Sequence, residues 1–161
     1  MDSERTDTAT EPGTDSDDAP KASERVSYLG FHLGSEIYGL PLEQLREVAR
    51  VSRLRRVPGA RPGVAGLVNL RGEIICALDL RAILGMPDEG KKAEFLIALR
   101  GFADPIGVLV DSIADIFSIA VQDIEPVPPE WTPERAARFV GAVHIPAGLI
   151  GLLDLERVVQ L

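Results

Sequence analysis

The chain has 161 residues, a hydrophobic fraction of 45%, a single cysteine and a formal net charge of -8. This length allows one domain or two very small ones, and a lone cysteine excludes both an internal disulfide framework and a cysteine-only metal site. The two histidines, His32 and His144, belong to no spaced ligand cluster, so we assign no metal and no cofactor. No apolar run has the length of a membrane span and no signal peptide is recognisable, so we expect a cytoplasmic protein.

Charge is concentrated at the N-terminus. Residues 1–25 contain eight acids and three bases, a net charge of -5 that leaves -3 for the rest of the chain. They include almost no large apolar side chains, so they cannot bury enough surface to offset the entropy of ordering. We therefore predict a disordered acidic arm over 1–25 and a folded domain over 26–161.

From residue 26 onward, short apolar runs alternate with glycine and proline, which is typical of β-rich structure. The stretch "SYLGFHLGSEIYGLPL" predicts a hairpin in which one strand ends at Leu33 and the next begins at Glu36. The following "LEQLREVAR" has apolar residues three apart and predicts a helical turn or two. A second hairpin is expected around 101–104, and a further strand is expected to end at Ile119.

An internal repeat organises the domain. Residues 66–84, "GLVNLRGEIICALDLRAIL", align without a gap with residues 141–159, "GAVHIPAGLIGLLDLERVV". Each copy predicts strand, tight turn, strand and short helix, with Asp79 and Asp154 at the helix N-caps. We expect two similar subdomains, about 36–90 and 91–155, with terminal segments free to cross over. Units this small should pack together, and their sheets should close into small barrels.

The two copies differ at the turn. The first has the sequence Asn69-Leu70-Arg71-Gly72, whereas the second has proline and alanine at the positions of Arg71 and Gly72. A nearby glycine serves the turn because it accepts a positive φ, but the turn does not require an arginine. A guanidinium group beside an amide suits recognition of a carboxylate or a backbone edge. The alternative is that Arg71 is simply a solvated hairpin tip.

Catalysis and nucleic-acid binding are disfavoured. No nucleophile and base are grouped in a catalytic motif, and no glycine-rich phosphate loop opens a helix, so we expect no enzyme activity. Residues 46–81 contain eight arginines and three acids, a net charge of +5 that could contact phosphates. However, this segment has no aromatic residue for base stacking and the whole chain is acidic. We expect it to steer an acidic protein partner instead.

Four successive blocks of the sequence are "FHLGSEIYGLPLEQLREV", "PGVAGLVNLRGEIICALDL", "PIGVLVDSIADIFSI" and "FVGAVHIPAGLIGLLDLERVV". Together, over about Tyr28 to Val159, they resemble the chemotaxis coupling protein family, the CheW family. The resemblance implies an all-β fold with a few short helices, in which two SH3-like five-stranded barrels pack together. It also implies a non-catalytic adaptor that couples membrane chemoreceptors to a cytoplasmic histidine kinase. Such a protein is recruited to membrane-associated receptor arrays without inserting into the membrane.

In this family one barrel pairs with the regulatory domain of the kinase, and a groove between the barrels takes the hairpin tip of the receptor. Carried over to this sequence, the resemblance implies a set of partner contacts. They are Asn69, Arg71, Gly72, Gly66, Leu45, Glu47, Ile113 and Ile116. The competing interpretation is that Leu45, Ile113 and Ile116 are core residues and that Glu47 is a solvated charge.

One stretch departs from the family pattern. The segment "ARVSRLRRVPGARPG", residues 49–63, is more basic than the resemblance leads us to expect, which leaves the identity of the partners open. An alternative function is therefore a family member rewired to a divergent pathway, such as surface motility or development, or a non-activating component of the array.

Overall fold

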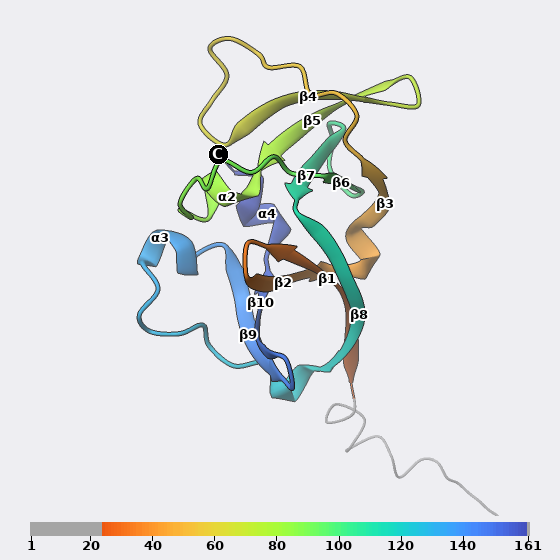
Figure 1. The fold of residues 1–161 in the computed structure, drawn as a ribbon. Helices are drawn as coiled ribbons and strands as arrows, with labels where there is room; N and C mark the ends of the chain where they lie inside the picture. Colours follow the sequence, from red (N-terminus) through yellow and green to blue (C-terminus); the bar gives the residue numbers. More distant parts are fainter. Residues whose placement is uncertain (1–23, 161) are drawn as a thin grey trace, which may run out of the picture.

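The computed structural model of the protein describes residues 24–160, so the predicted arm over 1–25 lies outside the described residues except for Glu24 and Arg25. Two five-stranded sheets make up the fold, and Figure 1 shows one above the other. The lower sheet contains β1 (Arg25–Leu33), β2 (Glu36–Pro41), β8 (Ser112–Ala120), β9 (Phe139–Ile145) and β10 (Gly148–Leu153). The upper sheet contains β3 (Leu45–Arg50), β4 (Val64–Leu70), β5 (Glu73–Asp79), β6 (Phe95–Leu99) and β7 (Ile106–Val110). The expected all-β fold of two five-stranded units is confirmed.

Short helical segments lie between the strands and after the last one. They are η4 (Leu42–Gln44), α2 (Leu80–Ile83), η5 (Val121–Asp123), α3 (Pro133–Ala136) and α4 (Leu155–Val158). None of the helices between residues 24 and 160 has the length and apolar character needed to cross a membrane.

The two sheets divide the chain differently from the expected 36–90 and 91–155. The upper sheet uses one continuous stretch, 45–110, whereas the lower sheet combines 25–41 with 112–153. The reason is a parallel pairing between β2 and β10, in which Ile37 lies opposite Ile150. Parallel neighbours cannot be joined by a tight turn, so a large segment of chain must intervene between them. Here that segment includes the whole of the upper sheet.

The sheets have the same internal arrangement in circularly permuted order. The neighbour orders are β8-β1-β2-β10-β9 and β3-β6-β7-β5-β4, each with its one parallel pair in the same place. The repeated hairpins, β4–β5 and β9–β10, occupy matching positions. Leu152 lies opposite Gly39, and Ala77, its counterpart in the repeat, lies opposite Gly107. The internal repeat is therefore a structural one.

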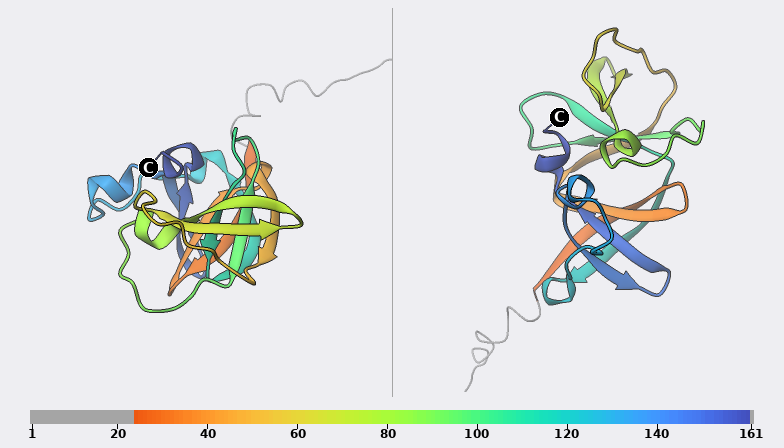
Figure 2. Two further views of the ribbon diagram at one scale, coloured as in Figure 1. Left: turned by 90° about the horizontal axis from the view of Figure 1, so that it is seen from above. Right: turned by 90° about the vertical axis from the view of Figure 1, so that its left-hand side faces the viewer.

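The largest apolar cluster is shared between the sheets. It combines Phe31 and Leu40 of the lower sheet with Ile97 and Val108 of the upper sheet. Val158 of α4 is fully buried in this cluster, and Figures 1 and 2 show α4 between the sheets. Two smaller clusters lie within the individual sheets. The two units therefore pack together through a common core, as their small size requires.

The predicted hairpins are confirmed as β1–β2 and β6–β7, and the strand expected to end near Ile119 is β8. The helix predicted in "LEQLREVAR" is wrong beyond Gln44, because alternate residues of β3 face inward and the segment pairs with β6. Asp79 caps α2, accepting a hydrogen bond from the Ala82 amide at 3.3 Å. Asp154 occupies the corresponding position but makes no side-chain cap; it pairs with Arg157 instead.

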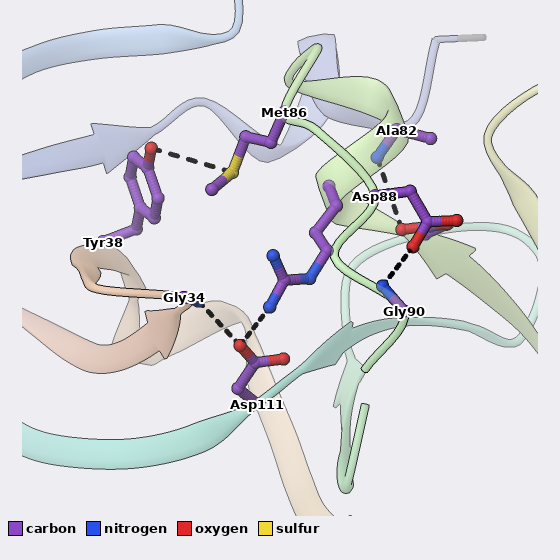
Figure 3. A network of polar contacts seen from close by, with 9 residues as sticks. Gly34, Tyr38, Ala82, Met86, Asp88, Gly90 and Asp111 are labelled. Carbon is purple, nitrogen blue, oxygen red and sulfur yellow. Dashed lines mark hydrogen bonds and ion pairs between the residues drawn. The ribbon is translucent and has the colours of Figure 1, made fainter. Parts of the chain in front are cut away.

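A polar contact fixes the sheets relative to each other. Asp111, between β7 and β8, accepts a hydrogen bond from the Gly34 amide at 2.6 Å, as Figure 3 shows. The same carboxylate pairs with the guanidinium group of Arg81 on α2. Because Gly34 belongs to the β1–β2 turn and α2 follows β5, this network ties the lower sheet to the upper one.

Candidate functional site

The β4–β5 hairpin presents the predicted contact residues on a tight turn. Leu70 pairs with Glu73, which leaves Arg71 and Gly72 as a two-residue loop. Their φ angles are 53° and 87°, so both central residues are left-handed, as a type I′ turn requires. The side chain of Asn69 accepts a hydrogen bond from the Gly72 amide at 2.9 Å. Asn69 and Gly72 therefore stabilise the turn itself.

Arg71 is a costly residue at this position. Between residues 24 and 160 it is the one non-glycine residue with a positive φ. A left-handed backbone costs an ordinary L-residue about 1–2 kcal/mol, and asparagine or glycine is preferred at this place in the turn. The side chain is 79% exposed, so it contributes little packing in return. The turn alone gives no reason for an arginine.

Two ion pairs connect this hairpin to β3. Nε of Arg71 lies 3.6 Å from Oε2 of Glu47, and Nη2 of Arg46 lies 2.5 Å from Oε1 of Glu73. Strands β3 and β4 are the two edges of the upper sheet. The ion pairs therefore draw its edges together, and a backbone bridge between Arg55 and Leu67 does the same further along.

Glu47 is the less exposed partner in its ion pair. Its side chain is 24% exposed, and its Oε2 atom is buried with no hydrogen-bond donor among the residues that the structure describes. Arg71 contributes charge at 3.6 Å but no hydrogen bond at that distance. The carboxylate and the exposed guanidinium group together form a charged site that retains unused hydrogen-bonding capacity.

Gly66 has a role in the fold. A Cβ atom at this position would lie 2.4 Å from the backbone oxygen of Arg55. The equivalent Gly141 in the second copy is similarly crowded, because its Cβ would lie 2.6 Å from the backbone oxygen of Glu125. Both glycines are buried. Their presence in both copies is explained by this close backbone approach.

The other predicted residues lie on the edge strands. Leu45 on β3 and Ile113 on β8 are partly buried and pack against the shared core. Ile116, also on β8, is 58% exposed, so the core interpretation does not apply to it. The structure thus brings together Asn69, Arg71, Gly72 and Glu47. Gly66 is buried within β4, and Ile113 and Ile116 belong to the other sheet.

Sequence reasoning missed Arg46 and Glu73. They form the shorter of the two ion pairs that link β3 to the hairpin. The sequence did contain a signal. Both segments hold an arginine followed by a glutamate, Arg46-Glu47 on β3 and Arg71-Gly72-Glu73 at the turn, so two crossed ion pairs can form between them. Nothing in the local pattern indicated, however, that these segments are opposite edges of one sheet.

The groups that the hairpin site presents are charged and polar side chains on a fixed turn. No group of three His, Cys, Asp or Glu side chains capable of holding a metal is found between residues 24 and 160. Burial, and to a smaller extent the charge of Asp104, raises the pKa of the Cys76 thiol, which makes it a poorer nucleophile at neutral pH. The hairpin site offers a guanidinium group, a carboxylate and a fixed turn, which suit recognition of a protein surface.

Comparisons with known proteins agree on one family. The family model described as "CheW-like domain" matches residues 27–161. The chemotaxis protein CheW of Bacillus subtilis is 28% identical over 131 residues, which cover 81% of this chain and 84% of the relative. The chemotaxis protein CheW of Klebsiella aerogenes is 25% identical, with 83% and 81% covered. Protein FrzA of Myxococcus xanthus is 27% identical, with 88% and 90% covered.

A solved structure supports the same grouping. The crystal structure of scaffolding protein TtCheW from Thermoanaerobacter tengcongensis is similar, with a TM-score of 0.74 and 26% sequence identity. The similarity covers 86% of this chain and 94% of that one. The SH3-like, two-unit architecture expected from the sequence is consistent with this match.

Proposed function

Because the chain belongs to the CheW-like domain family, we propose that it is a chemotaxis adaptor that couples chemoreceptors to a histidine kinase. It acts without catalysis, by holding its partners together at membrane-associated receptor arrays. One barrel binds the regulatory domain of the kinase, and the groove between the barrels binds the hairpin tip of the receptor.

The observation that carries the assignment of a contact site is the conformation of Arg71. An exposed arginine occupies a left-handed position that a type I′ turn would fill better with asparagine. Residues that store backbone strain cluster at binding sites, where strain is offset by function. Arginine is also enriched among residues that dominate interface energies. We therefore place Arg71 at the centre of a partner contact that includes Asn69, Gly72 and Glu47.

The edge strands supply a second set of contacts. Ile116 on β8 presents a large apolar side chain to solvent, while Ile113 and Leu45 are partly buried beside the shared core. An exposed isoleucine on an edge strand is suited to the apolar face of a helical hairpin. This surface belongs to the same proposal and accounts for the receptor contact.

The mechanism is a bias in a binding equilibrium. The adaptor changes kinase activity because it binds one arrangement of the kinase and receptor better than another. Individual contacts need only micromolar affinity, about -8 kcal/mol, because many linked contacts strengthen a lattice.

The direct test is a reconstituted kinase assay with receptors, in the presence and absence of this chain. An adaptor changes the autophosphorylation rate only when the receptor is present. The Arg71→Glu variant should lose at least about 2 kcal/mol of binding, as expected for a central arginine. Normal binding by this variant, or its unfolding, would show that Arg71 is not a contact residue.

A matched control comes from the second unit. Arg157 is exposed and pairs with Asp154 at 3.5 Å, much as Arg71 pairs with Glu47 at 3.6 Å. Arg157→Glu makes the same change of charge away from the hairpin. Equal loss of binding in both variants would point to net charge alone.

A second candidate function is supported by the similarity to protein FrzA. In this case the chain is a family member that serves a divergent pathway, such as surface motility or development, or occupies the array without activating the kinase. A reconstituted assay in which the chain binds receptor but leaves the kinase rate unchanged would favour this candidate.

A further inference from the structure

The arginine-rich part of the chain divides into paired and unpaired residues. Four of its arginines contact carboxylates. These pairs are Arg46 with Glu73, Arg50 with Glu94, Arg71 with Glu47, and Arg81 with Asp111. Arg53, Arg55 and Arg56 are exposed, and none of them has an ion pair with another residue in the described part of the chain. Within the arginine-rich part of the chain, the positive charge that lacks an ion pair therefore lies in one place.

That place is the connection between β3 and β4, residues 51–63, which we term the arginine loop. It contains four arginines and no acid. Figure 1 shows it at the top of the upper sheet, away from the start of β1. The proposed contact site on the β4–β5 turn does not include these arginines, so their charge could serve only to steer a partner in the proposed adaptor function.

The arginine loop has a defined backbone. The amide and carbonyl of Arg55 both bond to Leu67, at 2.9 and 2.7 Å. Two further turns are closed by hydrogen bonds from Ala60 to Val57 and from Val64 to Arg61. The crowding at Gly66 shows that the backbone at Arg55 lies directly against β4. The three unpaired guanidinium groups therefore project from an ordered scaffold.

The same chain contains a segment whose net charge is opposite in sign to that of the arginine loop. Residues 1–23 include seven acids and two bases. Fully extended, 23 residues span at most about 80 Å, whereas a folded domain of this size has a radius of gyration of only about 14 Å. The segment can therefore reach the arginine loop from the start of β1. Its attachment to the same chain keeps its effective concentration at the arginine loop high.

We propose that the arginine loop is a docking surface for the acidic N-terminal segment, residues 1–23, of the same chain. Several carboxylates bind the guanidinium groups of Arg53, Arg55 and Arg56 in exchangeable pairs. Docking screens the positive loop from other polyanions, so that only a more acidic partner displaces the segment. A nucleic acid is the less suitable occupant because the loop has no aromatic side chain on which bases stack.

Paramagnetic relaxation measurements on the full chain test this proposal. A spin label is attached at Ser16→Cys in a Cys76→Ala background, and the amides of the isotope-labelled protein are observed. At about 0.02 M salt we expect the amides of Arg53, Arg55 and Arg56 to be broadened. At about 1 M salt, where the Debye length is about 3 Å, the broadening should disappear.

The matched variants neutralise three cations each. The broadening should be abolished in the triple variant Arg53→Gln, Arg55→Gln and Arg56→Gln. It should remain in the control triple variant Lys91→Gln, Lys92→Gln and Arg100→Gln. A second measurement needs no cysteine exchange: Asp15→Asn, Asp17→Asn and Asp18→Asn together should shift the amide resonances of the arginine loop in otherwise native protein.

Three results would overturn the proposal. The first is a lack of broadening at low salt, and the second is an equal effect of both triple variants. The third is broadening that occurs only when spin label and isotope are in different molecules, which would make the contact intermolecular. Tight binding of single-stranded DNA to the arginine loop of the unmodified chain at about 0.15 M salt would also contradict it.

Discussion

Arg71 and Glu47 form an ion pair between the β4–β5 turn and β3, with Nε and Oε2 separated by 3.6 Å. The two residues belong to opposite edges of one sheet, and the arginine is held in a left-handed backbone conformation. An exposed ion pair is worth at most about 1 kcal/mol, which is no more than the backbone strain costs. The pair therefore gives the fold no net reason to retain arginine at this position.

The first prediction follows from this balance. Arg71→Asn converts the turn to Asn-Gly, the preferred pair for a type I′ loop. We expect the free energy of unfolding to rise by about 0.5–1 kcal/mol in urea titrations, because the left-handed strain is relieved. In the same variant, binding to the kinase or receptor should weaken because the guanidinium group is lost. Stability and function should thus change in opposite directions.

Arg157→Asn is the matched control for this prediction. It removes an exposed arginine from α4 that pairs with Asp154 and also donates a hydrogen bond to the Ala137 carbonyl at 3.4 Å, at a position where no positive φ is involved. The free energy of unfolding of this variant should stay the same or fall by a few tenths of a kcal/mol, because asparagine has a lower helix propensity than arginine. A loss of stability in Arg71→Asn would refute the strain argument, and full binding would refute the contact role.

The second prediction concerns the paired glycines of the repeat. Gly66→Ala places a Cβ 2.4 Å from the backbone oxygen of Arg55, and Gly141→Ala places one 2.6 Å from that of Glu125. Backbone must move in both cases, so each variant should lose about 2 kcal/mol or more of unfolding free energy. Thermal denaturation would show a lower midpoint for both.

Gly101→Ala separates crowding from backbone strain. Its φ is 92°, but a Cβ there would have no neighbour within 4 Å. We expect a loss of about 1 kcal/mol from strain alone. If Gly66→Ala loses no more unfolding free energy than Gly101→Ala, crowding is the wrong explanation. If the Gly66→Ala variant is stable but fails to bind partners, Gly66 is a contact residue.

The sequence predicted much of the architecture because several of its signals are local. Turn residues and short apolar runs located both hairpins, and the repeat located the units that carry Arg71 and its counterpart. Parallel pairing of Ile37 with Ile150 was not predictable, because it joins segments that are more than a hundred positions apart and leaves no local periodicity. For this reason the two sheets do not follow the expected subdomain ranges.

Contacts between segments far apart in the sequence also limited the prediction of the site. Comparison of the two turns singled out Arg71, but the positive φ at Arg71 and the pairing with Glu47 depend on the register of the hairpin and on the meeting of two sheet edges. The helix predicted over β3 shows the complementary error. Apolar residues spaced three apart suggested a helix, and the tertiary pairing with β6 overrode that pattern.

The third prediction concerns the contact that ties the two sheets together. The side chains of Arg81 and Asp111 are 12% and 20% exposed, and Oδ1 of Asp111 has no hydrogen-bond partner among the described residues. Removing Arg81 leaves this carboxylate with the Gly34 amide alone. Arg81→Ala should therefore cost about 2–3 kcal/mol of unfolding free energy.

A double-mutant cycle with Asp111→Ala measures the coupling, which we expect to be about 1–3 kcal/mol. The cycle for Arg50 and Glu94, an ion pair that is largely exposed, serves as the control and should give less than about 0.5 kcal/mol. Equal coupling in the two cycles would show that the Arg81 pair is only a surface contact.

The fourth prediction concerns the pH dependence caused by Cys76. Burial, with a smaller contribution from the charge of Asp104, raises the pKa of its thiol above the ordinary value. The folded protein therefore holds the thiol proton at pH values where the unfolded chain releases it. Unfolding is favoured as the pH rises past the ordinary thiol pKa, so stability should fall as the pH rises above about 8.5.

Cys76→Ala isolates this contribution, because the raised pKa values of Tyr28 and Tyr38 remain in both proteins. The variant should lose less stability than the native sequence over the same pH interval. Alkylation of native Cys76 by iodoacetamide at pH 8 should be slower than that of a free cysteine peptide, and Asp104→Asn should make it faster. Alkylation at the peptide rate, or identical pH slopes for the two proteins, would contradict the assignment.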